Sequence, residues 1–271
     1  MEKIRLSDNL KVNVVSETAT VGVFEIEGLY SGYGTTLGNA LRRVLLSSLP
    51  GAAITQIKIK GVGHEFTTIP GVVEDIVEIM LNLKKVRLAF EVAYSDYEQP
   101  EIVTLKSKGE GEVTAGDIKS TNLVRVVNPD QHIATITQKG TDLEIELTIE
   151  KGMGYVPVEA LKSEALPVGT IQLDAIFSPI VKVNFIVENM RVGERTDYNR
   201  LKFSIDTDGT ITPSAAIRKS ASILQDHFAK VYDHLAALKG PELELVSKGV
   251  AEAEAIEEKA TKKTKRKKKE E

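Results

Sequence analysis

The chain has 271 residues but contains no cysteine and no tryptophan, and only 5% of its residues are aromatic. Without cysteine, it cannot form disulfides, thiolate metal sites, iron–sulfur clusters or a cysteine nucleophile. It also lacks an apolar run near the ~18 residues that a membrane span needs, and its first residues have no apolar signal-peptide core. These absences predict a cytoplasmic protein, and the 42% hydrophobic and 27% charged fractions are those of an ordinary globular chain.

The usual catalytic motifs are missing as well. The four histidines have no zinc-ligand spacing, there is no Gly-x-Ser-x-Gly elbow, and there is no aspartate cluster to hold two magnesium ions. The acidic pair Glu74-Asp75 falls in a helical pattern and is interpreted as a solvated face. We therefore predict no catalytic residue, no cofactor and no metal in this chain.

Gly32, Gly34 and Gly38 stand between a predicted strand and a predicted helix, as glycines of a phosphate-binding loop do. Their spacing does not match the dinucleotide pattern, and no Gly-Lys-Ser/Thr follows. We expect these glycines to form a tight turn and to allow close helix packing. A nucleotide-binding enzyme that uses this turn remains the less favoured alternative.

Charge is unevenly distributed along the chain. The net charge of −4 argues against a protein that coats nucleic acid with its whole surface. Seven basic residues are concentrated between Lys262 and Lys269. We predict that residues 240–271 form a disordered charged tail, whose Lys262–Lys269 run contacts DNA only weakly and without sequence preference.

Hydrophobic periodicity predicts an α+β protein. A helical pattern occupies residues 32–49, a second short one precedes Lys84, and a long one runs from Pro213, with Thr212 as N-cap, to Gly240-Pro241. Strands are predicted at 12–30, 53–61, between 86 and 152, and at 170–177, 181–187 and 201–206.

The first predicted helix has two unlike faces. Its apolar face is formed by Leu37, Ala40, Leu41, Val44 and Leu45. The opposite face carries Arg42, Arg43 and Leu46. Arginine beside an exposed apolar side chain is typical of the centre of a protein–protein interface, although single exposed leucines are also common.

Apolar residues recur every seven positions along the last predicted helix, in two series offset by four. The first series is Ile217, Leu224, Val231 and Leu238, and the second is Ala221, Phe228 and Leu235. This is the a/d seam of a coiled coil, and it favours self-association. The alternative is an amphipathic helix packed on a sheet of its own chain.

Residues 32–51 closely resemble the signature helix of bacterial RNA polymerase alpha subunits. Further fragments of that family follow in the same order, and the resemblance covers about residues 1–238. They are His64-Glu65-Phe66, Glu74-Asp75-Ile76, Leu81-Asn82-Leu83-Lys84, Gly154-Tyr155-Val156-Pro157, Asp174-Ala175-Ile176-Phe177-Ser178-Pro179, Arg195-Thr196-Asp197 and Thr207-Asp208-Gly209-Thr210-Ile211.

The resemblance implies a discontinuous two-domain module. Residues 1–52 and 170–239 would fold together as an α/β dimerisation domain, and residues 53–169 would form a mostly β insert domain. The family's usual helical DNA-binding domain appears absent here, because only about thirty residues follow the last helix. Any contact with DNA is then expected through the assembled complex.

The resemblance also implies the function: a non-catalytic assembly subunit of DNA-dependent RNA polymerase, a nucleotidyltransferase complex, that homodimerises and joins the beta and beta-prime subunits. For beta we expect contact through Arg42, Arg43 and Leu46, and for beta-prime through Lys84, Arg191, Arg195 and Asp197. For the dimer we expect Leu37, Leu41, Val44 and Leu45 together with Ile217, Ala221, Leu224, Phe228, Val231, Leu235 and Leu238. The alternatives are a free-standing homodimeric binding protein and, for each charged residue, a surface ion pair of little energetic value.

Overall fold

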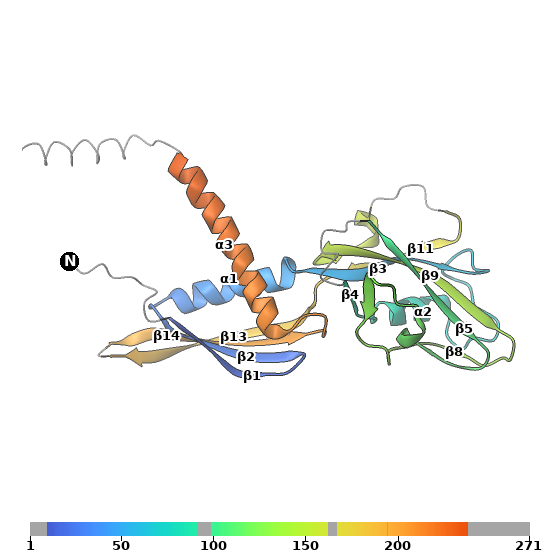
Figure 1. Cartoon of the computed structure of the whole chain (residues 1–271), viewed down its shortest axis with the longest axis horizontal. Coiled ribbons are helices and arrows are strands. Elements are labelled where there is room, and N and C mark those ends of the chain that lie inside the picture. The colour runs from blue at the N-terminus through green and yellow to red at the C-terminus, as the bar shows by residue number, and fades with distance from the viewer. Residues whose placement is uncertain (1–9, 91–98, 162–166, 194, 238–271) are drawn as a thin grey trace, which may run out of the picture. The chain divides into compact units, whose positions relative to one another are not determined.

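The computed structural model of this chain describes residues 10–90, 99–161, 167–193 and 195–237 (Figure 1). The residues up to Leu224 form one compact unit, and those from Gln225 onward belong to a second. The first unit contains two main sheets, each with its own apolar core. The predicted charged tail, including Lys262–Lys269, and Leu238 of the predicted seam lie outside the described residues.

The first sheet joins strands from both ends of the chain. It is antiparallel, in the order β1-β2-β14-β13, and Phe24 of β2 lies opposite Phe203 of β14. Helix α1 contacts β13 and β14, and its Leu45 is fully buried in the core of this sheet. The elements are β1 (Lys11–Glu17), β2 (Val21–Leu29), α1 (Tyr33–Ser47), β13 (Ile180–Val192) and β14 (Arg195–Thr207).

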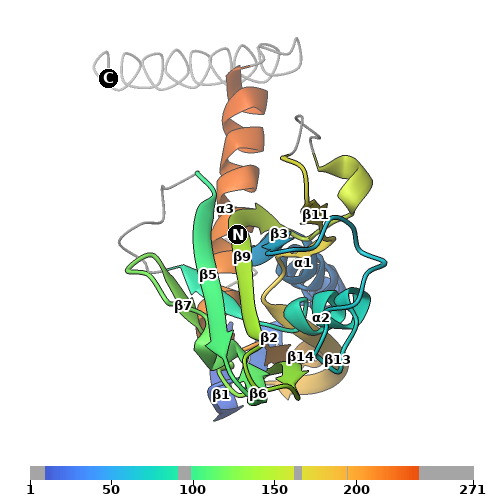
Figure 2. The same cartoon turned by 90° about the vertical axis from the view of Figure 1, so that its right-hand side faces the viewer.

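The second sheet is built from the middle of the chain (Figure 2). Its order is β5-β9-β3-β4-β7, and β11 also pairs with β3. Helix α2 packs into its core, where Ile76, Ile79 and Leu83 have no exposed surface. The elements are β3 (Pro50–Ile59), α2 (Ile76–Leu83), β4 (Leu88–Phe90), β5 (Glu101–Lys108), β7 (Val124–Val126), β9 (Asp142–Met153) and β11 (Thr170–Gln172).

Smaller elements complete this part of the chain. Strands β6 and β8 pair with each other, as do β10 and β12. Two short 3-10 helices follow β6 and β10. These elements are β6 (Gly111–Thr114), η2 (Ala115–Asp117), β8 (His132–Ile136), β10 (Tyr155–Val156), η3 (Val158–Ala160) and β12 (Ala175–Ile176).

The α+β class and the predicted helices are confirmed. Helix α2 begins at Ile76, because the side chain of Asp75 accepts a hydrogen bond from the backbone N–H of Glu78 at 2.7 Å and so forms the N-cap. Helix α3 (Pro213–Ala237) begins at the predicted proline. Thr212 Oγ1 accepts a hydrogen bond from the backbone N–H of Ala215 at 3.4 Å. In the described part of the chain, none of the helices is both long and apolar enough for a transmembrane segment.

The glycines before and within α1 have conformational and packing roles. Gly32 has a φ of +85°, which is readily adopted only without a Cβ. A Cβ at Gly34 would lie 2.7 Å from Val187, and one at Gly38 would lie 2.8 Å from the ring of Phe185. These distances are too short for real Cβ contacts, so the two glycines set how closely α1 lies on β13 and β14. The turn-and-packing interpretation therefore fits the structure.

We predict that Gly38→Val lowers the free energy of unfolding by about 1–3 kcal/mol, because the added carbons overlap the Phe185 ring. Asn39→Val introduces the same side chain one position along, where α1 is exposed, and should change stability by less than about 0.5 kcal/mol. Urea denaturation followed by circular dichroism at one fixed protein concentration measures both. Equal stability of the two variants would contradict the packing role of Gly38.

Candidate partner-binding surfaces

Helix α1 has one buried and one exposed face. Leu41 and Leu45 are 4% and 0% exposed, whereas Arg42 and Arg43 are exposed and Leu46 keeps 40% of its surface. Among the described residues, neither guanidinium has an ion-pair partner. The three residues predicted to contact beta therefore form an accessible cationic and apolar patch.

The predicted dimer residues of α1 divide into two groups. Leu41 and Leu45 belong to the core of their own sheet and have almost no surface left for a second copy. Their contribution to a dimer is to hold α1 in position. Leu37 and Val44 are half-buried and keep surface that a partner can contact. The dimer role of all four stays a prediction.

The exposure of the predicted seam residues changes along α3. Ile217 and Leu224 are half-buried against the core of the four-stranded sheet, as the alternative interpretation expects. Ala221 is exposed. In the second unit, the larger apolar side chains of α3 are exposed: Phe228 by 67%, Val231 by 55%, Tyr232 by 73% and Leu235 by 59%. Tyr232 was not among the residues predicted for the seam, because it falls outside the seven-residue pattern.

Lys84, predicted to contact beta-prime, is held in an ion pair. Its Nζ lies 2.8 Å from Asp174 Oδ2, and the side chain is 26% exposed. Asp174 Oδ1 also accepts a hydrogen bond from the backbone N–H of Val158 at 3.1 Å. The hydrogen bond from Lys84, aided by that from Val158, lowers the pKa of Asp174. The ion pair thus ties the end of α2 to the segment between β11 and β12, and Asp174 in turn is hydrogen-bonded to Val158 after β10.

Arg195 and Asp197, also predicted to contact beta-prime, are partners of each other. Arg195 donates from Nε and from one terminal nitrogen to the two carboxylate oxygens of Asp197, at 3.0 and 2.7 Å. This pairing raises the pKa of Arg195, with Tyr30 contributing, and lowers the pKa of Asp197. The guanidinium also lies 5.0 Å from the ring centroid of Tyr30 and 5.4 Å from that of Tyr198.

Arg191 lies on the same hairpin and is held by its own loop. Its Nε donates to the carbonyl oxygen of Gly193 at 2.8 Å. Arg191, Arg195 and Asp197 are therefore brought together at one end of the β13–β14 hairpin, whereas Lys84 directly follows α2, which packs on the other sheet. The rings of Tyr30 and Tyr198, which lie near Arg195, were not expected from the sequence. The contact with Tyr30 depends on the pairing of β14 with β2, whereas Tyr198 lies three residues along the same strand as Arg195.

The interpretation of Glu74-Asp75 as a solvated helix face is wrong. Asp75 is the N-cap of α2, and the side chain of Glu74, only 11% exposed, precedes the helix. Glu74 accepts hydrogen bonds from His132 Nε2 at 2.8 Å and from the backbone N–H of Thr135 at 2.6 Å. No local pattern could reveal this, because these partners are about sixty residues away along the chain.

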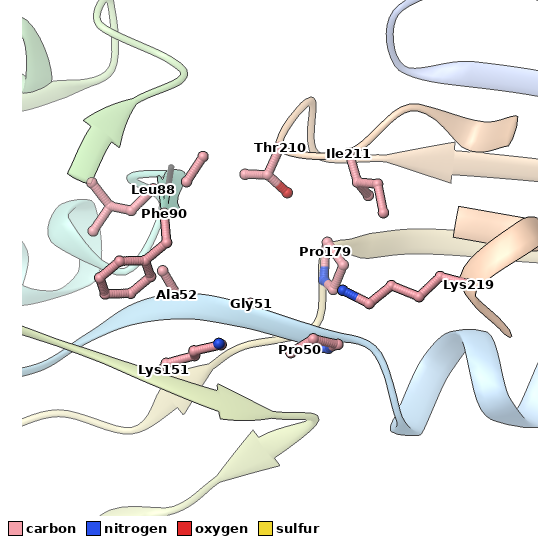
Figure 3. A pocket seen from close by; sticks show the side chains of 11 residues that line it. Pro50, Gly51, Ala52, Leu88, Phe90, Lys151, Pro179, Thr210, Ile211 and Lys219 are labelled. Carbon is pink, nitrogen blue, oxygen red and sulfur yellow. The ribbon is translucent and has the colours of Figure 1, made fainter. Parts of the chain in front are cut away.

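A cleft of about 300 Å³ opens where β3 begins (Figure 3). Its walls come from β3, β4, β9, the segments before β13 and α3, and α3 itself. None of its lining residues belongs to the Gly32–Gly38 turn that the nucleotide-binding alternative would use. The lining residues are Pro50, Gly51, Ala52, Leu88, Ala89, Phe90, Lys151, Pro179, Thr210, Ile211 and Lys219.

Comparison with known proteins gives matches over most of the chain. Residues 57–178 match the family model described as the RNA polymerase Rpb3/RpoA insert domain. A protein of Symbiobacterium thermophilum is 50% identical over 214 residues, which are 79% of this chain and 66% of that protein. One of Alkaliphilus oremlandii is 48% identical over 230 residues, 83% of this chain and 71% of that protein.

A protein of a Roseiflexus species is 48% identical over 223 residues, 82% of this chain and 67% of that protein. All three relatives are named DNA-directed RNA polymerase subunit alpha. The chain spans about two thirds of the length of these relatives. Identity near one half over so long an alignment shows that the chain belongs to the family of DNA-directed RNA polymerase alpha subunits.

Proposed function

We propose that this chain is a non-catalytic assembly subunit of DNA-dependent RNA polymerase, which forms a homodimer and joins the beta and beta-prime subunits in the cytoplasm. The observation that carries the proposal is the match to alpha subunits at 48–50% identity. In this proposal the large subunits hold the magnesium, the nucleotide and the DNA. The chain contributes surfaces on which the large subunits assemble.

Two domains would divide this work. We propose a dimerisation domain of residues 1–52 and 170–239 and an insert domain of residues 53–169. The two separate apolar cores support a division into two domains, and the family match over residues 57–178 overlaps the proposed insert domain. This support does not extend to the boundary at residue 170, because Ile171 and Leu173 belong to the core of the second sheet, where β11 pairs with β3.

The patch of Arg42, Arg43 and Leu46 is the proposed beta contact. Two arginines that have no ion-pair partner among the described residues keep all their donors for a partner, and Leu46 supplies apolar surface beside them. Truncating arginine anchors at the centre of an interface costs more than truncating most other residues. Because Leu41 and Leu45 are buried on the opposite face, the patch is held on a fixed helix.

The proposed beta-prime contact is the hairpin end with Arg191, Arg195 and Asp197. Because the Arg195–Asp197 pair is already formed, it would meet a partner as a preorganised unit with little net charge. Lys84 is the weaker member, since Asp174 already neutralises it.

A free-standing homodimeric binding protein is the rival proposal, and it is not favoured by the family match. Co-purification from cells distinguishes the two. An assembly subunit brings down two large chains in stoichiometric amounts, whereas a free-standing dimer is recovered alone.

For the beta contact, we expect Arg43→Ala to weaken capture of the beta subunit by about thirtyfold, equivalent to about 2 kcal/mol, and to leave the dimer intact. Lys119→Ala removes an exposed cation elsewhere and serves as the matched control. Titration of each folded dimer with beta subunit measures the affinity. Unchanged affinity of the Arg43 variant would remove this residue from the interface.

For the dimer, we expect Leu235→Asp to give a folded monomer. Leu235 is 59% exposed in the single chain, so its change should leave the fold intact, but burial of an unpaired carboxylate in a dimer costs several kcal/mol. Lys230→Asp introduces the same side chain at a position outside the seam. Light scattering gives the mass, and circular dichroism gives the helix content. If both variants stay dimeric, the part of the seam formed by Phe228, Val231 and Leu235 is not the interface.

For Lys84, we expect Lys84→Gln to lower the free energy of unfolding at pH 7 by roughly 0.2–1 kcal/mol. The pKa of Asp174 is lowered in the folded state, so the pair stabilises the fold above about pH 4 and ceases to do so as the pH falls through that lowered pKa. The difference from wild type should therefore shrink toward pH 3 in urea denaturation. Lys85→Gln, at the exposed neighbour, should show no such trend.

A further inference from the structure

His132 at the start of β8 lies between two carboxylates. Its Nε2 is 2.8 Å from Glu74 Oε1, and its Nδ1 is 2.8 Å from Glu112 Oε1. Glu74 precedes α2, whereas Glu112 lies on β6, so the ring joins two separate elements to β8. The side chains differ in exposure: 36% for His132, 11% for Glu74 and 63% for Glu112.

This geometry requires a charged ring. A neutral imidazole has one N–H donor and one bare nitrogen, whereas the imidazolium donates from both nitrogens. A carboxylate is an acceptor only, so each of the two 2.8 Å contacts needs an N–H on the histidine. If the ring loses its proton, one of the two carboxylates faces a nitrogen lone pair and its contact becomes repulsive.

The segment held by this ring is the entry to α2. Val73 N–H donates to the carbonyl of Thr135 at 3.0 Å, and Thr137 N–H donates to that of Gly71 at 2.8 Å. Glu74 also accepts a 3.1 Å hydrogen bond from Thr135 Oγ1. Residues 71–75 are thus attached to β8 by backbone hydrogen bonds as well as by the Glu74 side chain.

The outward side of this region is apolar. Val73 is 66% exposed, and Val77 and Leu81 on α2 follow at 40% and 51%. Val77 and Leu81 are four apart on α2 and share one exposed face, whereas Val73 lies in the segment before the helix. The position of Val73 depends on how residues 71–75 are held.

We propose that His132 is a pH-responsive clamp: while its ring is charged, it fixes residues 71–75, which lead into α2, to the paired strands β6 and β8, and when the ring loses its proton this segment loosens. The proposal concerns a conformational device within residues 71–137 and does not depend on the assembly role. It makes residues 71–75, including the exposed Val73, firmly held while the ring is charged and more mobile once the ring has lost its proton.

The charged groups that face the ring all favour its charged form. They are Glu74, from the segment before α2, and Glu112, from β6, whereas β8 itself carries no other ionisable side chain. The hydrogen bond to Glu74 outweighs burial and, with that to Glu112, raises the pKa of His132. Burial raises the pKa of Glu74, but hydrogen bonds from Thr135 and His132 outweigh it and leave this pKa below its usual value.

The signs then define a pH window. A raised pKa of His132 in the folded state means that the clamp contributes fully below the unfolded pKa of about 6.5 and is lost as the pH rises through the folded pKa. A lowered pKa of Glu74 means that its contribution is lost only at acidic pH, below its unfolded pKa of about 4.3. The clamp is therefore closed at pH values above the folded pKa of Glu74 and below the folded pKa of His132.

Two measurements on the full chain test the clamp. In NMR of protein with 13C-labelled histidine, His132 should titrate above pH 6.5, and its signal is identified by its loss in His132→Gln. In hydrogen exchange, protection of peptides covering 71–75, corrected for intrinsic rates, should fall between pH 6.0 and 8.5. Within that pH range, the protection is expected to fall about tenfold for each pH unit by which the folded pKa of His132 exceeds its unfolded pKa. Peptides from the middle of β9 should not change in this way.

Glu112→Gln gives a milder test, since Glu112 is exposed and its loss should preserve the fold. This variant should lower the pKa of His132 and shift the loss of protection to lower pH. Glu110→Gln, the matched change at an exposed neighbour, should do neither. A His132 that titrates at or below pH 6.5, or protection of residues 71–75 that is independent of pH, would overturn the proposal.

Discussion

The close approach of α1 to the four-stranded sheet is the constraint on which the rest of this molecule depends. Gly34 and Gly38 leave no room for a Cβ against Val187 and Phe185, and Leu45 is fully buried in the core of the sheet. Since the strands beneath α1 come from near both ends of the described chain, this contact holds together segments about 150 residues apart in sequence. It also makes α1 a rigid helix.

Rigid placement of α1 determines which side chains a partner can meet. One face of α1 is buried in the core, so Arg42, Arg43 and Leu46 are exposed on the other face. The same division recurs in α3, where Ile217 and Leu224 contact the core and Phe228 and Leu235 are exposed. The proposed assembly surfaces therefore consist of the side chains that intrachain packing leaves exposed, and this holds for both helices.

Ion pairs alter how the charged candidates can act. Lys84, at the end of α2, is paired with Asp174, which lies between β11 and β12, and Arg195 is paired with Asp197 on the same strand. Such pairs position segments of the chain before any partner arrives. A partner would recognise their shape and hydrogen-bonding groups more than their net charge. His132, between Glu74 and Glu112, extends this principle to an imidazole whose pKa the two carboxylates raise.

Hydrophobic periodicity and capping residues in the sequence determined the α+β class, the helix start at Pro213 and the two faces of α1, because these depend on local spacing and capping. The start of α2 at Ile76 came from the structure, since the sequence pattern placed Glu74 and Asp75 on that helix. The family match rests on ordered motifs and was also available from the sequence. Only the tertiary structure decided that Leu41 and Leu45 are core, that Lys84 is neutralised by Asp174, and that Glu74 is held by His132. Each of these depends on residues brought together from distant parts of the chain, and periodicity carries no information on such pairings.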